Sequence, residues 1–425
     1  METRLRPALD RSALRERYLR NRARSRELFA IPAPEAYLDR PIPLRLPIVF
    51  YDGHLPAFSY NTLMRAALGA PSIDPLFEGI FERGIDPPDE RSAAPRVAPP
   101  AWPHPDAVAA FGAAVDRAVL TALAEADLTD GARSPMLERA QAAYTILEHE
   151  ELHHETLLYM LHRLPFEHKR AARYAEARAA APAARVPVEV GAGLATLGAE
   201  ADDVEFGWDN EFSRTQIAVA AFEIDADSVT NADWLAFVRD GGPIAPFWRE
   251  RDGEFELLTQ FEAIALPPAW PVYATHEQAQ AYARWRGGRL PTEAEYHRAA
   301  YGTPEGDERR FPWGDDAPTA AHGNFGFRRF DPEPVGASPA GASAWGVYDL
   351  VGNGWEWTAT PFAPLPGFAP MASYPAYSAD FFDGAHYVLK GASPVTALPL
   401  IRRSFRNWYR ADYPYVYAKF RLVTS

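Results

Sequence analysis

The chain has 425 residues, a hydrophobic share of 47% and a formal net charge of −14. This length predicts two or three domains, and the apolar share is enough for substantial cores. The acidic balance argues against nucleic acid or an anionic membrane surface as the main partner, and the absence of cysteine excludes disulfides, thiolate catalysis and cysteine metal sites.

The N-terminal residues 1–28 are rich in arginine and have no apolar stretch long enough for a secretory signal. The sequence also has no run of about 18 apolar residues, the length that a membrane-spanning helix needs. We therefore expect a soluble cytoplasmic protein.

The first part of the chain has the pattern of a helical domain. Periodic apolar residues, with proline or serine at several entries, predict helices over residues 11–29, 54–68, 106–126 and 134–164. Four long helices favour a four-helix bundle. Residues 171–187 are rich in alanine and arginine and end in prolines, which predicts a linker.

After the linker, the sequence changes to short strand-like runs with many glycines, tryptophans and aspartates. Clear helices are predicted only near residues 231–240 and 276–286, which indicates a mixed domain with long loops. The expected fold class is therefore α+β. We expect a helical domain over 1–170, a linker over 171–187 and a mixed domain over 188–425.

The helix predicted over 134–164 contains two histidines four residues apart, His149 and His153. Residues at this spacing project from the same face of a helix, so both imidazoles can reach one metal ion. The string His149-Glu150-x-x-His153 also matches the zinc-protease motif, in which the glutamate is the general base. That class needs a third ligand farther along, and we expect His162 on a roughly opposite face of the same helix.

A third histidine, His54, lies at the predicted start of the second helix. A lone histidine there is usually a cap or a packing residue, but metal sites in bundles draw their ligands from several helices. Three neutral imidazoles would leave open positions on an ion, as in facial-triad iron sites, although imidazole also suits zinc, copper or nickel.

Motifs along the whole chain resemble a known family. The N-terminal part resembles a DinB-like bundle with a His-x-x-x-His-x-Glu signature, here His149, His153 and Glu155. The C-terminal part resembles the formylglycine-generating-enzyme (sulfatase-modifying-factor) fold, a variant of the C-type lectin fold. Its motifs here are Trp208–Glu211, Val229–Asn231, Asp240–Gly242, Gly288–Glu295, Phe311–Gly314, Gly352–Thr358 and Ser404–Trp408.

The pairing of these two domains resembles the ergothioneine-synthase type of non-haem iron enzyme. This resemblance implies an oxygen-dependent sulfoxide synthase that acts on hercynine, the trimethylated betaine of histidine. It also implies Fe(II) as the cofactor, held by His54, His149 and His153. The mixed domain is expected to complete the substrate site.

The same resemblance implies roles for residues that contact hercynine. Phe50 is implied beside the permanent cation, which favours aromatic faces. The Asn407 amide and the Trp408 indole are implied as donors to the carboxylate. A tyrosine is expected to assist proton transfer, and both Tyr374 and Tyr377 lie in the corresponding loop.

The positions expected to bind the second substrate differ from those of ergothioneine enzymes that use γ-glutamylcysteine. Those enzymes carry basic residues for its carboxylates, whereas residues 81–91 are net acidic here and Tyr409 and Tyr413 replace an aspartate and an arginine. Such a pocket suits a neutral, hydroxyl-rich donor, as in the selenoneine synthases of this family, which join hercynine to selenium from a selenosugar. The candidate donor-binding residues are Arg83, Asp86, Tyr409, Tyr413 and Tyr415.

Two alternatives stay open. One is an ergothioneine-type synthase that forms a C–S bond between hercynine and a thiol such as γ-glutamylcysteine or cysteine. The other is a non-catalytic metal- or ligand-binding protein of the same fold. A formylglycine-generating role is disfavoured, because a chain without cysteine cannot carry the active cysteines of that enzyme.

Overall fold

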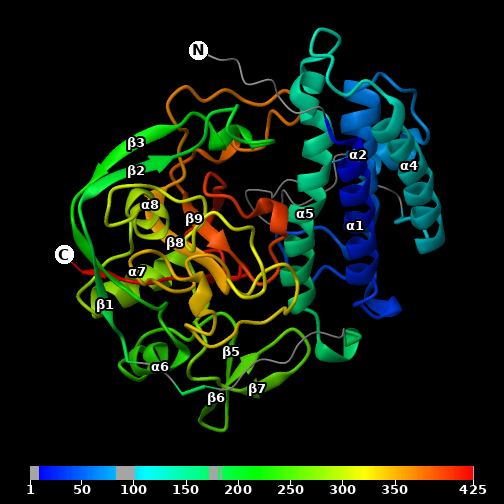
Figure 1. The fold of residues 1–425 in the computed structure, drawn as a ribbon. Coiled ribbons are helices and arrows are strands. Elements are labelled where there is room, and N and C mark those ends of the chain that lie inside the picture. The colour runs from blue at the N-terminus through cyan, green and yellow to red at the C-terminus, as the bar shows by residue number, and fades with distance from the viewer. Residues whose placement is uncertain (1–8, 83–100, 172–179, 182–183, 425) are drawn as a thin grey trace, which may run out of the picture. The chain divides into compact units, whose positions relative to one another are not determined.

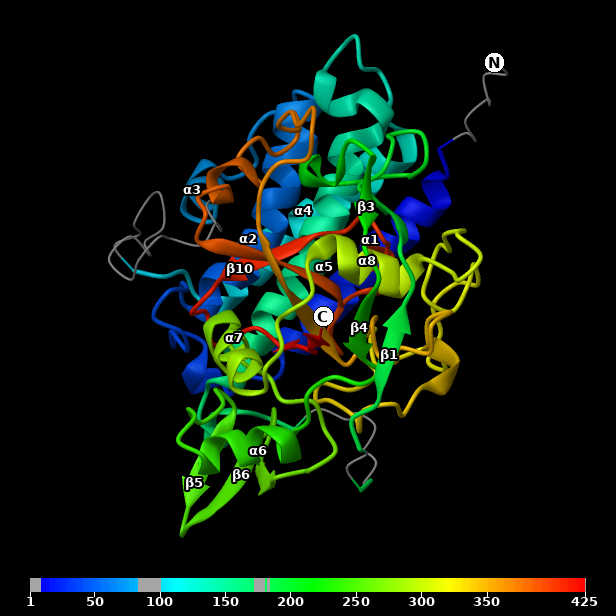
Figure 2. The same cartoon turned by 90° about the vertical axis from the view of Figure 1, so that its left-hand side faces the viewer.

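The computed structural model describes residues 9–82, 101–171, 180–181 and 184–424, and Figures 1 and 2 show its ribbon. The chain divides into two compact units. The helical unit consists of Met1–Ala171 together with Ala372–Tyr374, and the mixed unit consists of Ala172–Met371 and Pro375–Ser425. Arg83, Asp86 and most of the predicted linker lie outside the described residues.

Long helices build the helical unit (Figure 1). They are α1 (Arg11–Phe29), α2 (Ile48–Ser59), α4 (Pro105–Glu125) and α5 (Gln141–His162). α1 and α2 each pack against both α4 and α5. The predicted bundle is thus confirmed. The shorter helical elements of this unit are η1 (Pro34–Ala36), η2 (Tyr60–Ala67), α3 (Pro75–Ile80), η4 (Pro135–Ala140) and η5 (Phe166–His168).

The second helix begins earlier than the sequence predicted. α2 starts at Ile48, directly after Pro47, and the chain continues as the π-helix η2. Pro56 lies inside α2, although its nitrogen has no hydrogen to donate to the helix ladder. His54 is therefore in the second turn of the helix and fully buried, and not at the helix start.

The helix predicted over 134–164 is interrupted near its start. Arg139 and Ala140 have φ angles of 60° and 58°, in the left-handed region that L side chains rarely adopt. These two residues end η4 and directly precede α5. His149 and His153 therefore lie on a helix that begins at Gln141.

One helix among the described residues, α4, is long and apolar enough to cross a membrane by length and composition. This is weak evidence, because the core helix of a soluble protein passes the same test. Asp116 of α4 accepts hydrogen bonds from Tyr18 Oη at 2.8 Å and Arg22 Nε at 2.9 Å, so the helix also makes polar contacts within the bundle.

Small sheets form the framework of the mixed unit (Figure 2). One has the order β10-β9-β8-β11, made of β8 (Gly354–Pro361), β9 (His386–Ala392), β10 (Asn407–Arg410) and β11 (Ala418–Lys419). The others are β1 (Pro187–Val190) with β4 (Phe222–Asp225) and β12 (Val423–Thr424), β2 (Gly193–Leu197) with β3 (Thr215–Val219), and β5 (Trp248–Arg251) with β6 (Glu254–Leu258) and β7 (Ala263–Ala265).

Among the described residues, three α-helices accompany these sheets, and the sequence predicted two of them. α6 (Asn231–Arg239) and α7 (His276–Trp285) lie where they were expected, whereas α8 (Glu293–Tyr301) was not predicted. Thr292 begins α8 with a capping box, because its hydroxyl accepts from the Glu295 amide while the Glu295 carboxylate accepts from the Thr292 amide. Tyr296 and Ala299 of α8 lie in a buried core of this unit.

Candidate metal centre

Three histidines converge inside the helical unit. His54 comes from α2, and His149 and His153 come from successive turns of α5. One nitrogen from each ring can be chosen so that all three lie within 4.8 Å of one another. The ring centroids are 5.1 Å apart for His54–His149, 5.0 Å for His54–His153 and 4.4 Å for His149–His153. The structure thus brings together the three ligands that the family resemblance implied.

The hydrogen bonding of these rings fits a bound metal ion. His54 Nδ1 lies 2.7 Å from the Phe81 carbonyl oxygen, which can only accept, so we assign the proton to Nδ1 and a free lone pair to Nε2. His54 Nε2, both ring nitrogens of His149 and Nδ1 of His153 are buried with no hydrogen-bond partner among the described residues. Buried polar atoms are rarely left unpaired, and a cation at the centre of the cluster would satisfy them.

Burial keeps the three rings in the form that binds metals. Desolvation lowers the pKa of His54 to about 4, against the opposing effect of its hydrogen bond to Phe81. Burial also lowers the pKa of His149 and His153 well below the usual range, and the neighbouring imidazoles lower both further. All three rings are therefore neutral near pH 7, and a metal ion does not have to displace protons from them.

Aromatic rings fix the orientation of the histidines. Phe50 is fully buried and stacks on His54, with ring centroids 5.1 Å apart and an interplanar angle of 16°. Phe58 stacks on His149, with ring centroids 3.5 Å apart and an interplanar angle of 7°. The ring centroids of Tyr51 and His153 are 5.8 Å apart. Phe50 is the aromatic residue that the family resemblance implied. Tyr51 and Phe58 were not predicted, although their helical spacing from His54 could have indicated them.

A short segment from far along the chain completes this cluster. Ala372–Tyr374 belongs to the helical unit, where the Ser373 amide donates to Gln141 Oε1 at 3.0 Å and the Ser373 hydroxyl lies 2.7 Å from that of Thr145. The Tyr374 ring lies 6.2 Å from His149 and 5.2 Å from Phe58. Of the two candidate tyrosines, Tyr374 is therefore the one in the unit that holds the histidines.

The other candidate, Tyr377, belongs to the mixed unit. Its ring stacks on Trp208 at 3.9 Å and meets Trp408 edge to face at 5.1 Å. Trp408 follows Asn407 on β10 and stacks on Phe362 at 4.3 Å, while the Asn407 side-chain oxygen accepts from the Trp408 amide at 2.9 Å.

The three tyrosines proposed for the donor pocket form a cluster in the mixed unit. Tyr409 and Tyr413 stack with centroids 4.8 Å apart, and Tyr413 and Tyr415 meet edge to face at 5.2 Å. Tyr413 is buried, and the other two are half-buried. The remaining two candidates for this pocket, Arg83 and Asp86, lie outside the described residues.

Glu150, the residue that a zinc protease would use as general base, takes part in a different contact. Its Oε1 accepts from Arg22 Nη1 at 2.9 Å and from the Ser25 hydroxyl at 2.5 Å, both on α1. His154 lies on the same side of α5, with its Nε2 at 2.9 Å from the Ser25 hydroxyl. This use of Glu150 argues against the protease interpretation.

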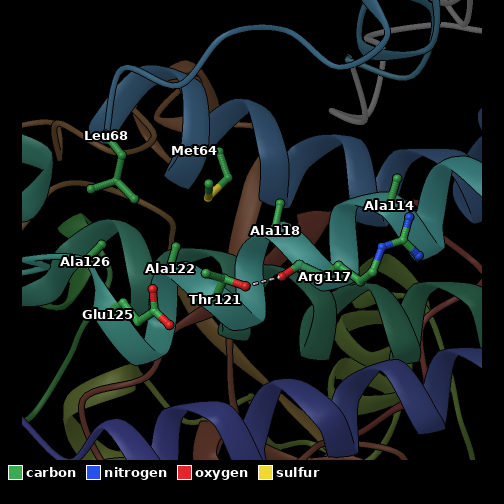
Figure 3. A pocket seen from close by; sticks show the side chains of 9 residues that line it. All are labelled: Met64, Leu68, Ala114, Arg117, Ala118, Thr121, Ala122, Glu125 and Ala126. Carbon is green, nitrogen blue, oxygen red and sulfur yellow. Dashed lines mark hydrogen bonds between the residues drawn. The ribbon is translucent and has the colours of Figure 1, made fainter.

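An open groove on the bundle surface is lined by none of the predicted site residues (Figure 3). Met64 of η2 and Leu68, which directly follows η2, face α4 across it. The remaining lining residues are Ala114, Arg117, Ala118, Thr121, Ala122, Glu125 and Ala126. Because these side chains are mostly small and apolar, the groove offers no chemistry comparable to that of the histidine cluster.

Two family models match the sequence. The sulfatase-modifying factor enzyme 1-like domain matches residues 173–425, and the DinB superfamily matches residues 17–157. These matches confirm the predicted fold class, a DinB-like bundle followed by a domain of the formylglycine-generating-enzyme type.

Curated proteins similar to this chain match along most of its length. Hercynine oxygenase of Mycolicibacterium thermoresistibile is 35% identical over 94% of this chain and 92% of its own length. Hercynine oxygenase of Mycobacterium tuberculosis is 34% identical over 95% of this chain and 96% of its own length. Ergothioneine biosynthesis protein 1 of Neurospora crassa is 28% identical over 92% of this chain but only 55% of its own length.

Proposed function

We propose a function from the premise that this chain belongs to the ergothioneine-synthase-type family, that of the hercynine oxygenases. The proposed activity is a metal-dependent, oxygen-dependent modification of hercynine by a soluble cytoplasmic enzyme. The observation that carries the proposal is the convergence of three buried, neutral imidazoles, each with at least one ring nitrogen that has no hydrogen-bond partner among the described residues.

We assign Fe(II) to the site formed by His54, His149 and His153. An all-imidazole set leaves positions on an iron ion for substrate and oxygen. When bound, iron supplies the electron transfer between O₂ and the substrates. The protein's own contribution is to hold the rings, through the Phe81 carbonyl and the stacked faces of Phe50 and Phe58.

The finer proposal is selenoneine synthesis. The imidazole C–H bond of hercynine and the Se–H bond of a selenosugar break, and a C–Se bond forms. O₂ is the oxidant, with one oxygen atom retained on selenium and the other released as water. The cluster of Tyr409, Tyr413 and Tyr415 supports a sugar donor, because aromatic faces stack on sugars and hydroxyl groups hydrogen-bond to them.

Hercynine presents three groups to the protein. We propose that its cation lies against aromatic rings, with Phe50 as the first candidate. Its carboxylate accepts hydrogen bonds from the Asn407 amide and the Trp408 indole. Tyr374 is proposed as the proton-transfer residue in preference to Tyr377, because its ring lies 6.2 Å from that of His149.

The test compares products. The Fe(II)-loaded protein is incubated with hercynine and O₂, together with either a selenosugar or γ-glutamylcysteine, and the products are identified by mass spectrometry. We expect turnover with the selenosugar and little with the thiol peptide. Selective turnover of γ-glutamylcysteine would reject selenium as the donor element while leaving the hercynine activity in place.

The names of the relatives favour a second candidate. Because they include ergothioneine biosynthesis proteins, the C–S bond-forming reaction with a thiol is the main alternative, and the same assay decides it. A non-catalytic binding protein of the same fold is a third possibility. It predicts no hercynine-dependent oxygen uptake, which an oxygen electrode measures.

A further inference from the structure

Gly53 lies in the interior of α2, directly before the proposed ligand His54, and is buried. Glycine is a poor helix former, and alanine would favour the helix more. There is nevertheless no room for a side chain here, because a Cβ atom built on Gly53 would lie within 2.5 Å of three ring carbons of Phe81. Real Cβ atoms essentially never approach other atoms more closely than 3.0 Å. The Phe81 ring therefore fills the space that a side chain at Gly53 would need.

Other aromatic rings prevent the Phe81 ring from moving aside. Phe81 is fully buried. Trp102 stacks on it with ring centroids 6.3 Å apart, Phe77 meets it edge to face at 5.7 Å, and the Phe50 ring lies 6.2 Å away. Side chains in such an interior are close-packed, so a ring cannot turn without displacing its neighbours. A side chain at Gly53 would therefore push the whole of Phe81 away from α2.

The backbone carbonyl of Phe81 is the hydrogen-bond partner of His54, whose Nδ1 lies 2.7 Å from the carbonyl oxygen. Phe81 directly follows the short helix α3, which is anchored at its own side chains. The Glu78 carboxylate of α3 is buried and accepts from the Ile73 amide at 2.8 Å and from the next amide at 3.1 Å. Because α3 is held in this way, Phe81 has little freedom to shift and still keep its oxygen on Nδ1. A side chain at Gly53 would therefore weaken or break the hydrogen bond to His54.

We propose that Gly53 is a positioning residue for the metal centre. Its lack of a side chain lets Phe81 pack on α2 and bring its carbonyl to His54, which keeps the proton on Nδ1 and leaves Nε2 to bind the metal. The inference rests on the proposed function for the presence of iron, whereas the packing of Phe81 on Gly53 does not. All the residues involved belong to the helical unit.

The test compares Gly53→Ala with the matched control Gly112→Ala. Gly112 is also a buried glycine inside a helix, α4, but a Cβ there would meet its nearest neighbours, Arg22 Nη2 and Pro56 Cγ, at the ordinary distances of 3.6 Å and 3.8 Å. The dissociation constant for Fe(II) is measured anaerobically by competition with a chelator. We expect it to rise about 10- to 100-fold in Gly53→Ala, the usual effect of disturbing the partner of a metal-binding histidine. In Gly112→Ala it should stay within about twofold of the wild-type value, because His54 and its partner are left in place.

A second variant separates the proposed role from a general loss of stability. Phe81→Val keeps the backbone carbonyl but lacks the ring carbons that a side chain at Gly53 would meet. In this background, Gly53→Ala should raise the dissociation constant by less than about threefold, because the two positions act through one contact. Urea denaturation shows whether each variant unfolds cooperatively.

Unchanged iron affinity in Gly53→Ala would overturn the inference, and so would an equal loss in Gly112→Ala or a loss that Phe81→Val does not relieve. The proposed function fails separately. If the wild type binds iron tightly and Gly53→Ala binds it weakly, but the wild type shows no hercynine-dependent oxygen uptake, the inference stands and the proposed function is wrong.

Discussion

At the scale of single residues, the proposed proton transfer depends on which tyrosine serves the three histidines. A Tyr374→Phe variant keeps the ring beside His149 and Phe58 but removes the hydroxyl proton. We expect kcat to fall about 10²- to 10⁴-fold, the usual contribution of a positioned proton donor. Tyr377→Phe is the matched control, because it preserves the stack on Trp208, and it should change kcat by less than about threefold. Steady-state kinetics with hercynine measures kcat for both variants. A larger loss of kcat in Tyr377→Phe than in Tyr374→Phe would show that the assignment is wrong.

Buried histidines also set the dependence of stability on pH. His276 stacks on Tyr387 and its Nε2 lies 3.0 Å from the Thr358 carbonyl, and burial lowers its pKa from 6.5 to about 4. As the pH falls from 6.5 toward 4, the His276 ring becomes protonated in the unfolded chain but stays neutral in the folded protein. The stability that the buried, neutral ring contributes is therefore complete above pH 6.5 and is lost as the pH falls toward 4.

We compare the stability of the wild type with that of His276→Gln, whose side-chain amide can still donate to the Thr358 carbonyl. The wild-type free energy of unfolding should fall by up to about 3 kcal/mol more than that of the variant between neutral pH and pH 4. Urea denaturation at several pH values measures this difference. Parallel curves for the two proteins would show that His276 titrates normally in the folded state.

At the scale of elements, the side chains of α5 take part in two separate sets of contacts. His149 and His153 face the cluster, while Glu150 pairs with Arg22 of α1. The side chains of Arg22 and Glu150 are almost fully buried. Removing the Arg22 guanidinium therefore leaves the Glu150 carboxylate buried without the cation that offsets its desolvation. We expect Arg22→Met to lower the free energy of unfolding by about 3–5 kcal/mol.

A control for this prediction lies on the same helix. Arg20 pairs with Glu16 across one turn of α1, and both side chains are about two-thirds exposed, at 67% and 66%. Exposed pairs of this kind contribute less than about 0.5 kcal/mol, so Arg20→Met should be nearly neutral in chemical denaturation. Equal destabilisation by the two variants would contradict the view that burial makes the Arg22 contact important.

Elements with strong local signals were predictable from the sequence, and those shaped by tertiary contacts were not. α1 occupies the predicted range because its periodicity and its Asp10 cap are local features. The sequence does not predict α8, although Thr292 and Glu295 form a capping box, because the helix is short and its apolar residues are buried through tertiary packing. The π-helix η2 has no comparable sequence signal, since it depends on how the bundle packs.

At the scale of the whole molecule, the site combines residues distant in the sequence. The spacing of His149 and His153 is visible in the sequence because both lie on one helix. The approach of His54 could be inferred only from the bundle and the family resemblance, and the choice of Tyr374 over Tyr377 needed the contacts of Ala372–Tyr374. Periodicity describes one element at a time, so it cannot place residues more than 200 positions apart beside one another.

The most direct test of the account is the iron content of the protein. Wild type, His54→Ala and the control His162→Ala are loaded anaerobically with Fe(II), freed of excess metal and analysed for iron per chain. We predict close to one iron per chain for the wild type and for His162→Ala, and little for His54→Ala, because removing one of three ligands weakens binding strongly. Full iron retention by His54→Ala would contradict a centre built from His54, His149 and His153.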